Sequence, residues 1–564
     1  MYFVIGILQF LGWNLISAIY HNSTPTEYHM YQQNNIMKYK IIIFFLNLSL
    51  LIFVTFSLIV STLQLVFFND FGNYALSFGG FDKTLGIEHS ANIFKALCKF
   101  LIALVGFCYV INQIVLFESG KRFFLFRHNR DDFIANGLFL SCSGAFFGLI
   151  NTNDIFNMYV FIEVSSICLY SSVFLNKTRD SIIAGFDYLI IGTFASCMIV
   201  FVIIILYYLT GQLNIDLIIS TIKNDSNILN NQNNQFLLSA SFVIFVLACF
   251  IKMGLPPFYK WAINFYTKSD LLLSSFTAPV ATKMFLYVLF CIVFKIYGSI
   301  DYFLVEEFKI FLINIFAFLI LLLSFLCFTD NNILRIIVFS SISNICYSIL
   351  AVLITQKNLS SSIVMVVGDV IIKSFIFGSL ALIVKKYYNI KIINLINNKT
   401  NKDFLKLIAN CDINLRTIFV ICFATIASIP PTPMFFAKID AMLQILNLNF
   451  YVIFIFLILA NLFSVLYFVK IVLFMIFFNN NDLNIRKILA TKLNIITFWH
   501  LNKDFQLKNI DCSNVHFKDS TINFVHNKSI KNKFFNEYFL FSTMFIICFG
   551  IYCLLSINLF KYGF

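Results

Sequence analysis

Long apolar runs are the feature of this sequence that most restricts its fold. The run at 181–209 contains Asp187 as its single charged residue, and many other runs also reach the roughly 20 residues that cross a bilayer as a helix. Only helices or closed barrels satisfy their backbone hydrogen bonds in lipid. Runs of this length indicate helices, so the sequence predicts an all-α integral membrane protein.

The composition agrees with this class. Hydrophobic residues make up 60% of the chain and charged residues only 12%, with a mean hydropathy of +0.86, whereas a soluble protein of this size needs a larger polar surface. A net charge of +13 is compatible with nucleic-acid binding, but in a membrane protein it is more typical of cytoplasmic loops. We therefore expect the lipid bilayer, and no nucleic acid, as a partner.

Motifs for bound cofactors are not found. The histidines all lie outside the apolar runs, which argues against a b-type cytochrome with axial histidines inside the bundle. The 14 cysteines form no CxxC pair, so neither a zinc site nor a disulfide framework is indicated. We expect no cofactor, metal or catalytic site in this chain, and any redox chemistry would belong to partner subunits.

The apolar runs predict about fourteen transmembrane helices. Their expected positions are 1–20, 40–68, 94–117, 133–150, 155–175, 181–209, 237–268, 271–297, 308–328, 333–355, 362–384, 413–447, 450–478 and 538–561. With these spans, the basic loops 118–132, 176–180, 385–412 and 479–537 fall on one side, and the acidic loop 301–308 falls on the other. The basic side is then cytoplasmic, in a bacterial inner membrane or an organelle inner membrane.

Prolines interrupt two of the expected spans. Pro256 and Pro257 lie in 237–268, and Pro430 and Pro431 lie in 413–447. Proline removes an amide donor and clashes with the preceding helical turn, so two broken helices are predicted. Because they lie five spans apart, we expect two repeats of about five helices, and broken helices at matching positions indicate an ion path. Ordinary proline kinks are the alternative.

This reasoning gives five regions. They are the N-terminal transmembrane helices (1–132), a first five-helix repeat (133–297), a second five-helix repeat (308–478), a basic polar cytoplasmic loop (479–537) and a C-terminal transmembrane helix (538–564).

Six ionisable residues inside the expected spans stand out as candidates for a functional site. Each costs roughly 2.5 to 3.5 kcal/mol at the bilayer centre on insertion scales. Burial disfavours the charged form of a lysine, and a nearby carboxylate favours it. We therefore expect a proton relay, with Glu163 and Lys252 as its switch and the other lysines as its stations; static buried ion pairs are the alternative. The six residues are Glu163, Lys252, Lys283, Asp369, Lys373 and Lys438.

Motifs around these residues resemble those of the antiporter-like membrane subunits shared by respiratory complex I and the Mrp-type Na+/H+ antiporters. The segments that carry the resemblance are NDIFNMYVFIEVSSICLY (153–170), IKMGLPPFYKW (251–261), ATKMFLY (281–287), TDNNILRIIVFSSISNICY (329–347) and SIPPTPMFFAK (428–438). Two further segments, GGFDKTLGIEH (79–89) and GDVIIK (368–373), are similar to segments of the D-type subunits of Mrp antiporters. The resemblance implies fourteen helices with two inverted five-helix repeats, a hydrated axis of lysine and glutamate, and work within a multisubunit complex.

The chain departs from the family pattern at several positions. Asp187 stands where the family often has lysine, Tyr259 and Gly368 where it often has histidine, and Ser428 where it has glycine; Pro433 and Met434 replace a Ser-Gly pair.

Together these observations predict a subunit of a cation/proton antiporter that conducts protons, with or without exchange for Na+. The alternative is a proton-pumping membrane subunit of NADH:quinone oxidoreductase, and a further alternative is a membrane scaffold that transports nothing. Other membrane subunits are the expected partners in each case.

Overall fold

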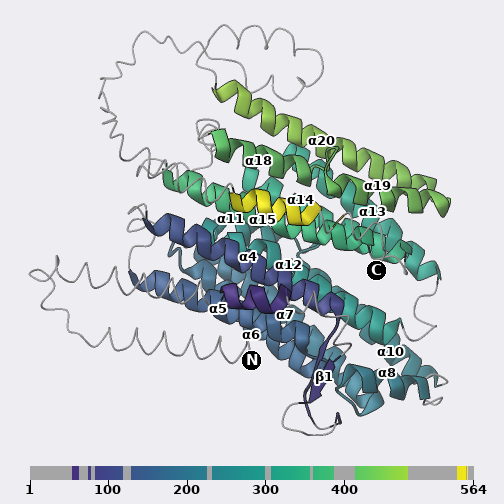
Figure 1. The fold of residues 1–564 in the computed structure, drawn as a ribbon. Helices are drawn as coiled ribbons and strands as arrows, with labels where there is room; N and C mark the ends of the chain where they lie inside the picture. The colour runs from purple at the N-terminus through teal and green to yellow at the C-terminus, as the bar shows by residue number, and fades with distance from the viewer. Residues whose placement is uncertain are drawn as a thin grey trace, which may run out of the picture.

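The protein is a bundle of long helices with one small hairpin at its edge (Figure 1). The computed structural model describes residues 54–62, 74–77, 83–84, 86–118, 129–224, 231–298, 306–355, 360–386, 413–479, 543–553 and 556. The helices of the first half are α4 (Ile93–Glu118), α5 (Asn129–Asn151), α6 (Ile155–Phe174), α7 (Arg179–Thr210), α8 (Ile215–Asn224), α10 (Gln232–Met253), α11 (Lys260–Lys268) and α12 (Leu271–Ile292), which continues as the π-helix η4 (Val293–Tyr297). Those of the second half are α13 (Glu306–Thr329), α14 (Ile333–Thr355), α15 (Ser360–Lys386), α18 (Ile413–Ile426), α19 (Pro433–Asn447) and α20 (Tyr451–Asn479).

Within the described residues, 10 helices are long and apolar enough to cross a membrane. This confirms the helical membrane class, while the total of fourteen stays a prediction. The expected span 1–20 lies outside the described residues, and only 54–62 of the span 40–68 and 543–553 and 556 of the span 538–561 lie within them. The loop 479–537 also lies outside them, apart from its first residue.

Burial separates central helices from peripheral ones. In both α14 and α15, 94% of the most apolar stretch of the helix is buried inside the bundle, compared with 44% in α7 and 28% in α20. The outer face of α7 exposes a stripe of apolar side chains that includes Ile190, Phe194 and Phe201, as expected for a surface that contacts lipid. The two halves meet where α12 packs against α15 in the middle of the bundle (Figure 1).

A two-stranded antiparallel sheet, which the sequence analysis did not predict, lies at one end of the bundle (Figure 1). It joins β1 (Tyr74–Ser77) to β2 (Glu88–Ala91), with Tyr74 opposite Ala91. Glu88 holds it in place, because its side chain accepts a hydrogen bond from Asn214 at 2.7 Å and its carbonyl accepts one from the amide of Asn153 at 2.9 Å. We call this end of the bundle, with the sheet and the starts of α4 and α6, the hairpin end.

The surface helix α8 was also missed by the sequence analysis. Its three isoleucines at 215, 218 and 222 are buried, and this spacing of three and four residues places them on one helix face. Asp216 and Lys223 lie in its first and last turns. An amphipathic helix of this length cannot span a bilayer, so it was invisible to a search for long apolar runs.

Both spans that contain a proline pair are broken, whereas α12 continues through its single Pro279, and the two breaks share one backbone geometry. In the first, the amide of Leu255 donates to the carbonyl of Phe250 at 3.0 Å; in the second, the amide of Ile429 donates to Ala424 at 3.0 Å. Each is the six-to-one hydrogen bond of a Schellman motif. The left-handed position is held by Gly254 (φ 70°) in the first break and by Ser428 (φ 56°) in the second.

The matched breaks support the prediction of two repeats. In each break the left-handed residue is followed by one apolar residue and then by two prolines, Pro256–Pro257 or Pro430–Pro431. Prolines cannot continue the preceding helix, so the same local sequence pattern ends both helices in the same way. The boundaries of the repeats stay a prediction.

Candidate functional site

The first polar cluster joins α6 to the end of α10. Lys252 is in the last turn of α10, with only 1% of its surface exposed. Its Nζ lies 3.7 Å from Oε1 of Glu163 and donates a hydrogen bond to the Ser166 hydroxyl at 3.0 Å. Since Glu163 and Ser166 are three residues apart, they share one face of α6. The predicted pair of Glu163 and Lys252 is therefore present, at a separation too long for a hydrogen bond.

The break after α10 fixes the position of Lys252. The Trp261 indole on α11 donates a hydrogen bond across the break to the carbonyl of Ile251 at 2.9 Å. The Trp261 ring stacks on Tyr188 of α7, with ring centroids 4.4 Å apart. The hydroxyl of Tyr188 is buried and has no hydrogen-bond partner among the described residues. The polar side chains that contact Lys252 are those of Glu163 and Ser166.

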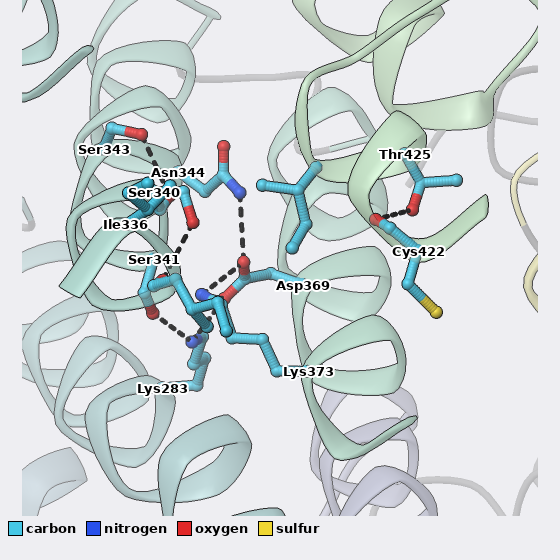
Figure 2. Close-up of polar contacts among 12 residues, drawn as sticks. Lys283, Ile336, Ser340, Ser341, Ser343, Asn344, Asp369, Lys373, Cys422 and Thr425 are labelled. Carbon is cyan, nitrogen blue, oxygen red and sulfur yellow. Dashed lines mark hydrogen bonds and ion pairs between the residues drawn. The ribbon is translucent and has the colours of Figure 1, made fainter. Parts of the chain in front are cut away.

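A second cluster lies where α12, α14 and α15 meet (Figure 2). Asp369 and Lys373 are one turn apart on α15, and Nζ of Lys373 lies 2.5 Å from Oδ1 and 2.6 Å from Oδ2 of Asp369. Lys283 of α12 forms an ion pair with the same Oδ2. All three residues are at most 4% exposed. Their spacing of four residues places Asp369 and Lys373 on one helix face, and the structure adds Lys283 to this pair.

A stripe of polar residues on α14 lines this region. Ser341 accepts a hydrogen bond from Lys283 at 3.2 Å, and Asn344 donates one to Oδ1 of Asp369 at 3.0 Å (Figure 2). One turn further, the ring of Tyr347 lies 4.6 Å from Nζ of Lys438. These residues lie in the segment 329–347, and no role was predicted for them from the sequence. Their spacing of three residues, which places them on one helix face, was the available signal.

Lys438 on α19 is the third polar position. It is 3% exposed, and no ion pair with it is found among the described residues. Its described partner is the face of the Tyr347 ring, whose hydroxyl donates to Oδ1 of Asn461 at 2.9 Å. A cation over an aromatic face is stabilised by the ring quadrupole, most strongly where water is excluded.

The predicted site residues therefore fall into three places. These are the pair Glu163–Lys252, the triad Lys283–Asp369–Lys373 and the single Lys438. Lys252 also lies 5.7 Å from the centre of the Phe285 ring, and Phe285 is two residues from Lys283 on α12, so the pair and the triad both contact this helix.

The sequence analysis missed buried charges at the hairpin end. Lys95 of α4 donates to the Ser90 hydroxyl at 2.6 Å and to the carbonyl of Asn151 at 3.3 Å. Burial, together with the positive charge of Lys95, lowers the pKa of His89 to about 4. Burial opposes ionisation of Glu88, but hydrogen bonds from Asn214 and Lys83 outweigh it and hold the pKa of this carboxyl below its usual value. His89 is therefore neutral and Glu88 is charged at neutral pH.

Two of the departures from the family pattern have structural explanations. A Cβ atom on Gly368 would lie 2.4 Å from the hydroxyl oxygen of Tyr552, so the C-terminal helical segment fills the space of a larger residue there. Asp187 accepts a hydrogen bond from Asn264 of α11 at 3.0 Å. The reversed charge at this position thus has a partner on the broken helix.

Comparisons with known proteins identify similar sequences and folds. The family model for the transmembrane region of NADH:quinone oxidoreductase and Mrp antiporters matches residues 152–464. The N-type subunit of NADH-quinone oxidoreductase from Helicobacter hepaticus is 25% identical over 432 residues, which cover 75% of this chain and 81% of that protein. The D-type subunit of the Na+/H+ antiporter from Bacillus subtilis is 28% identical over 221 residues, which cover 39% of this chain and 41% of that protein.

Solved structures show the same fold at low sequence identity. A chain of the Mrp complex from Dietzia sp. superposes with a TM-score of 0.64 at 15% identity, covering 83% of this chain and 78% of that chain. A chain of the archaeal membrane-bound sulfane sulfur reductase superposes with a TM-score of 0.65 at 19% identity, covering 79% and 87%.

Proposed function

Because the chain belongs to the NADH:quinone oxidoreductase/Mrp antiporter family of multi-pass membrane subunits, we propose that it conducts protons within a multisubunit membrane complex. The observation that carries the proposal is the gathering of six ionisable side chains, five of them buried and Glu163 partly exposed, at three places on the helices of the bundle. Such groups are costly at membrane depth. Titration during transport gives a reason for keeping them there.

In the first step we assign the switch to Glu163 and Lys252. Their separation of 3.7 Å leaves Oε1 of Glu163 without a hydrogen bond, so this oxygen is available to a water molecule or a proton. The Glu163 side chain is 25% exposed, whereas the Lys252 side chain is fully buried. Protonation of Glu163 would remove the negative charge that stabilises the Lys252 ammonium. Lys252 would then release its proton toward α12.

The later steps use the triad and Lys438. Lys283, on α12, would receive the proton, and Asp369 and Lys373 would pass it toward Lys438. The hydroxyl and amide groups of Ser341 and Asn344 already contact the triad, and they are suited to hold the water molecules that proton transfer requires. Tyr347 would stabilise the charged form of Lys438.

The broken helices supply an argument for partner subunits. Pro257 and Phe258 in the first break, and Pro430 and Pro431 in the second, are exposed on the surface of this chain. Irregular backbone at membrane depth is tolerated where protein or a water-filled cavity covers it. We therefore assign the surfaces around both breaks to contacts with other membrane subunits or to water-filled entrances.

Two assemblies are candidates, because the relatives include an Na+/H+ antiporter subunit and a subunit of NADH-quinone oxidoreductase. The antiporter assembly would exchange Na+ for protons, while the oxidoreductase would drive the same axis by electron transfer in partner subunits. Purification in mild detergent, with identification of the proteins that remain bound, separates the two. Iron–sulfur and flavin subunits would favour the oxidoreductase, and small membrane antiporter subunits would favour the antiporter.

Proton conduction is tested with the purified complex in vesicles that carry a pH gradient. We expect Lys252→Met to slow the collapse of the gradient by at least about a hundredfold, the lower range for loss of a proton-transfer group. Lys268→Met is the matched control, because Lys268 lies on α11 with a 39% exposed side chain paired to Asp180 at 2.8 Å. Equal rates in wild type and in an assembled Lys252→Met complex would contradict the proposal and favour a scaffold.

A further inference from the structure

The triad contains two lysines but only one carboxylate. Asp369 is 1% exposed, and it accepts from Lys283, Lys373 and Asn344. If both lysines were ammonium ions, the site would hold an uncompensated positive charge. A buried charge without a counter-ion is strongly unfavourable, and the group then neutralises instead. One ammonium and one neutral amine around the carboxylate make the site electrically neutral.

The surroundings do not supply a second negative charge. The described side chains that interact electrostatically with Asp369 or Lys373 are Lys438, Cys327, Tyr467 and Tyr552. None of these is an acid that ionises readily at neutral pH, and Lys438 adds a further positive charge when protonated. Glu163 pairs with Lys252. The charge balance of the triad therefore depends on the triad itself.

The two lysine amines contact the same carboxylate oxygen. Oδ2 of Asp369 contacts Nζ of both lysines, and Lys373 also reaches Oδ1 at 2.5 Å. Figure 2 shows both lysine side chains converging on this one carboxylate from different helices. A proton on either amine has the same acceptor beside it.

From this geometry we propose that Lys283, Asp369 and Lys373 form one proton-binding site in which two amines share a single ammonium proton across one carboxylate. The proposal rests on the proposed function and specifies its central step. The N–H bond of the Lys283 ammonium breaks as a proton moves to Oδ2, and the Lys373 amine then takes that proton from Oδ2. Lys283 ends as a neutral amine, Lys373 as an ammonium, and Asp369 is again ionised.

The two amines differ in what lies behind them. Lys283 borders a cavity of about 60 Å³ between α4, α12 and α15, whose other lining residues include Phe94 and Ser362 from the first turns of α4 and α15. The lining of the cavity is almost entirely apolar, and because a buried water molecule needs polar partners, this space is expected to be dry. Lys373 is not among the residues that line it. Free space therefore lies beside Lys283 but not beside Lys373.

Counting protons on denaturation tests the shared site without measuring transport. A neutral amine in the native site becomes an ammonium ion when the chain unfolds below the usual pKa of lysine, about 10.4, so the wild-type site takes up one proton. The purified complex is denatured with detergent at about pH 8.5 in weakly buffered solution, and the uptake is followed with a pH indicator. In Lys373→Met the remaining lysine pairs one-to-one with Asp369. We expect this variant to take up one proton fewer than wild type.

Lys283→Met gives the same expected loss of one proton and serves as the second variant, since each leaves Asp369 with one lysine partner. Lys268→Met is the control and should take up the same number of protons as wild type, because its exposed lysine is charged in both states. Equal uptake by wild type and both triad variants would overturn the proposal, because two native ammonium ions gain no proton. That result would leave proton conduction itself intact. Conversely, a difference of one proton in a complex that conducts none would support the shared site and remove the proposed function.

Discussion

The two helix breaks predict opposite effects of exchanging their left-handed residues. Gly254 has a φ of 70°, and a Cβ atom there would lie 2.9 Å from Cβ of Ala262. Gly254→Ala adds roughly 1–2 kcal/mol for the left-handed conformation and roughly 1–3 kcal/mol for overpacking. A less flexible unfolded chain offsets about 0.4–1 kcal/mol. The net destabilisation from these three contributions is then about 1–5 kcal/mol.

Ser428→Gly reverses the first of these contributions. Ser428 already has a φ of 56°, and its hydroxyl makes only a long contact of 3.4 Å to the carbonyl of Ile426. Relief of the left-handed strain, less the added freedom of the unfolded chain, gives a stabilisation of about 0.5–1 kcal/mol. Both variants are measured by detergent- or denaturant-induced unfolding of the purified complex. A neutral Gly254→Ala, or a destabilising Ser428→Gly, would refute the assignment of these residues to the same position of one motif.

Three further predictions concern other parts of the molecule. Because the folded-state pKa of His89 is lowered from 6.5 to about 4, its contribution to stability is complete above pH 6.5 and is lost as the pH falls toward 4. The protection of the amides of residues 86–92 from hydrogen exchange should therefore fall over this pH range in the wild-type protein. If His89→Gln showed the same pH dependence as wild type, the assignment of this effect to His89 would be contradicted. Gly368→Ala should destabilise the complex by about 1–3 kcal/mol, because its Cβ would lie 2.4 Å from the Tyr552 hydroxyl. Gly550→Ala is the control and should not destabilise it, because nothing lies within 4 Å of the added Cβ. Equal melting temperatures for the two variants would count against the packing of Tyr552 over α15. Tyr347→Phe keeps the aromatic ring 4.6 Å from Lys438 and should keep most of the proton conduction. Tyr347→Leu removes the ring and should lower the rate of proton conduction several-fold. Equal conduction rates for the two variants would exclude the ring as the partner of Lys438.

The broken helices were predictable because the prolines act locally. A proline pair ends a helix whatever surrounds it, and the structure breaks both helices at these positions. The partners of Asp369 were only half predictable. Its pairing with Lys373 follows from their spacing on one helix, whereas its pairing with Lys283 depends on the packing of α12 against α15, which no local pattern in the sequence encodes.

The hairpin shows a different limit. Its strands YALS and EHSA have four residues each, too short for a pattern of alternating burial to be recognised. What holds β2 is a hydrogen bond between Glu88 and Asn214, residues from distant parts of the chain. Lys95 and Lys99, in contrast, were present in an expected span and were overlooked. Lys95 is stabilised by the backbone carbonyls of Asn151 and Thr152. No local sequence pattern predicts hydrogen bonds to carbonyls from such a distant part of the chain.

The central claim is that the pair, the triad and Lys438 conduct protons one after another. The most direct test compares proton conduction by the vesicle-reconstituted complex carrying Lys252→Met, Lys438→Met or both. Because the times of successive steps add, conduction in series predicts that the double variant is only a little slower than the slower single variant. Two partial losses that add up to a complete loss in the double variant would contradict the account, because the rates of separate paths add and each lysine would then serve a path of its own.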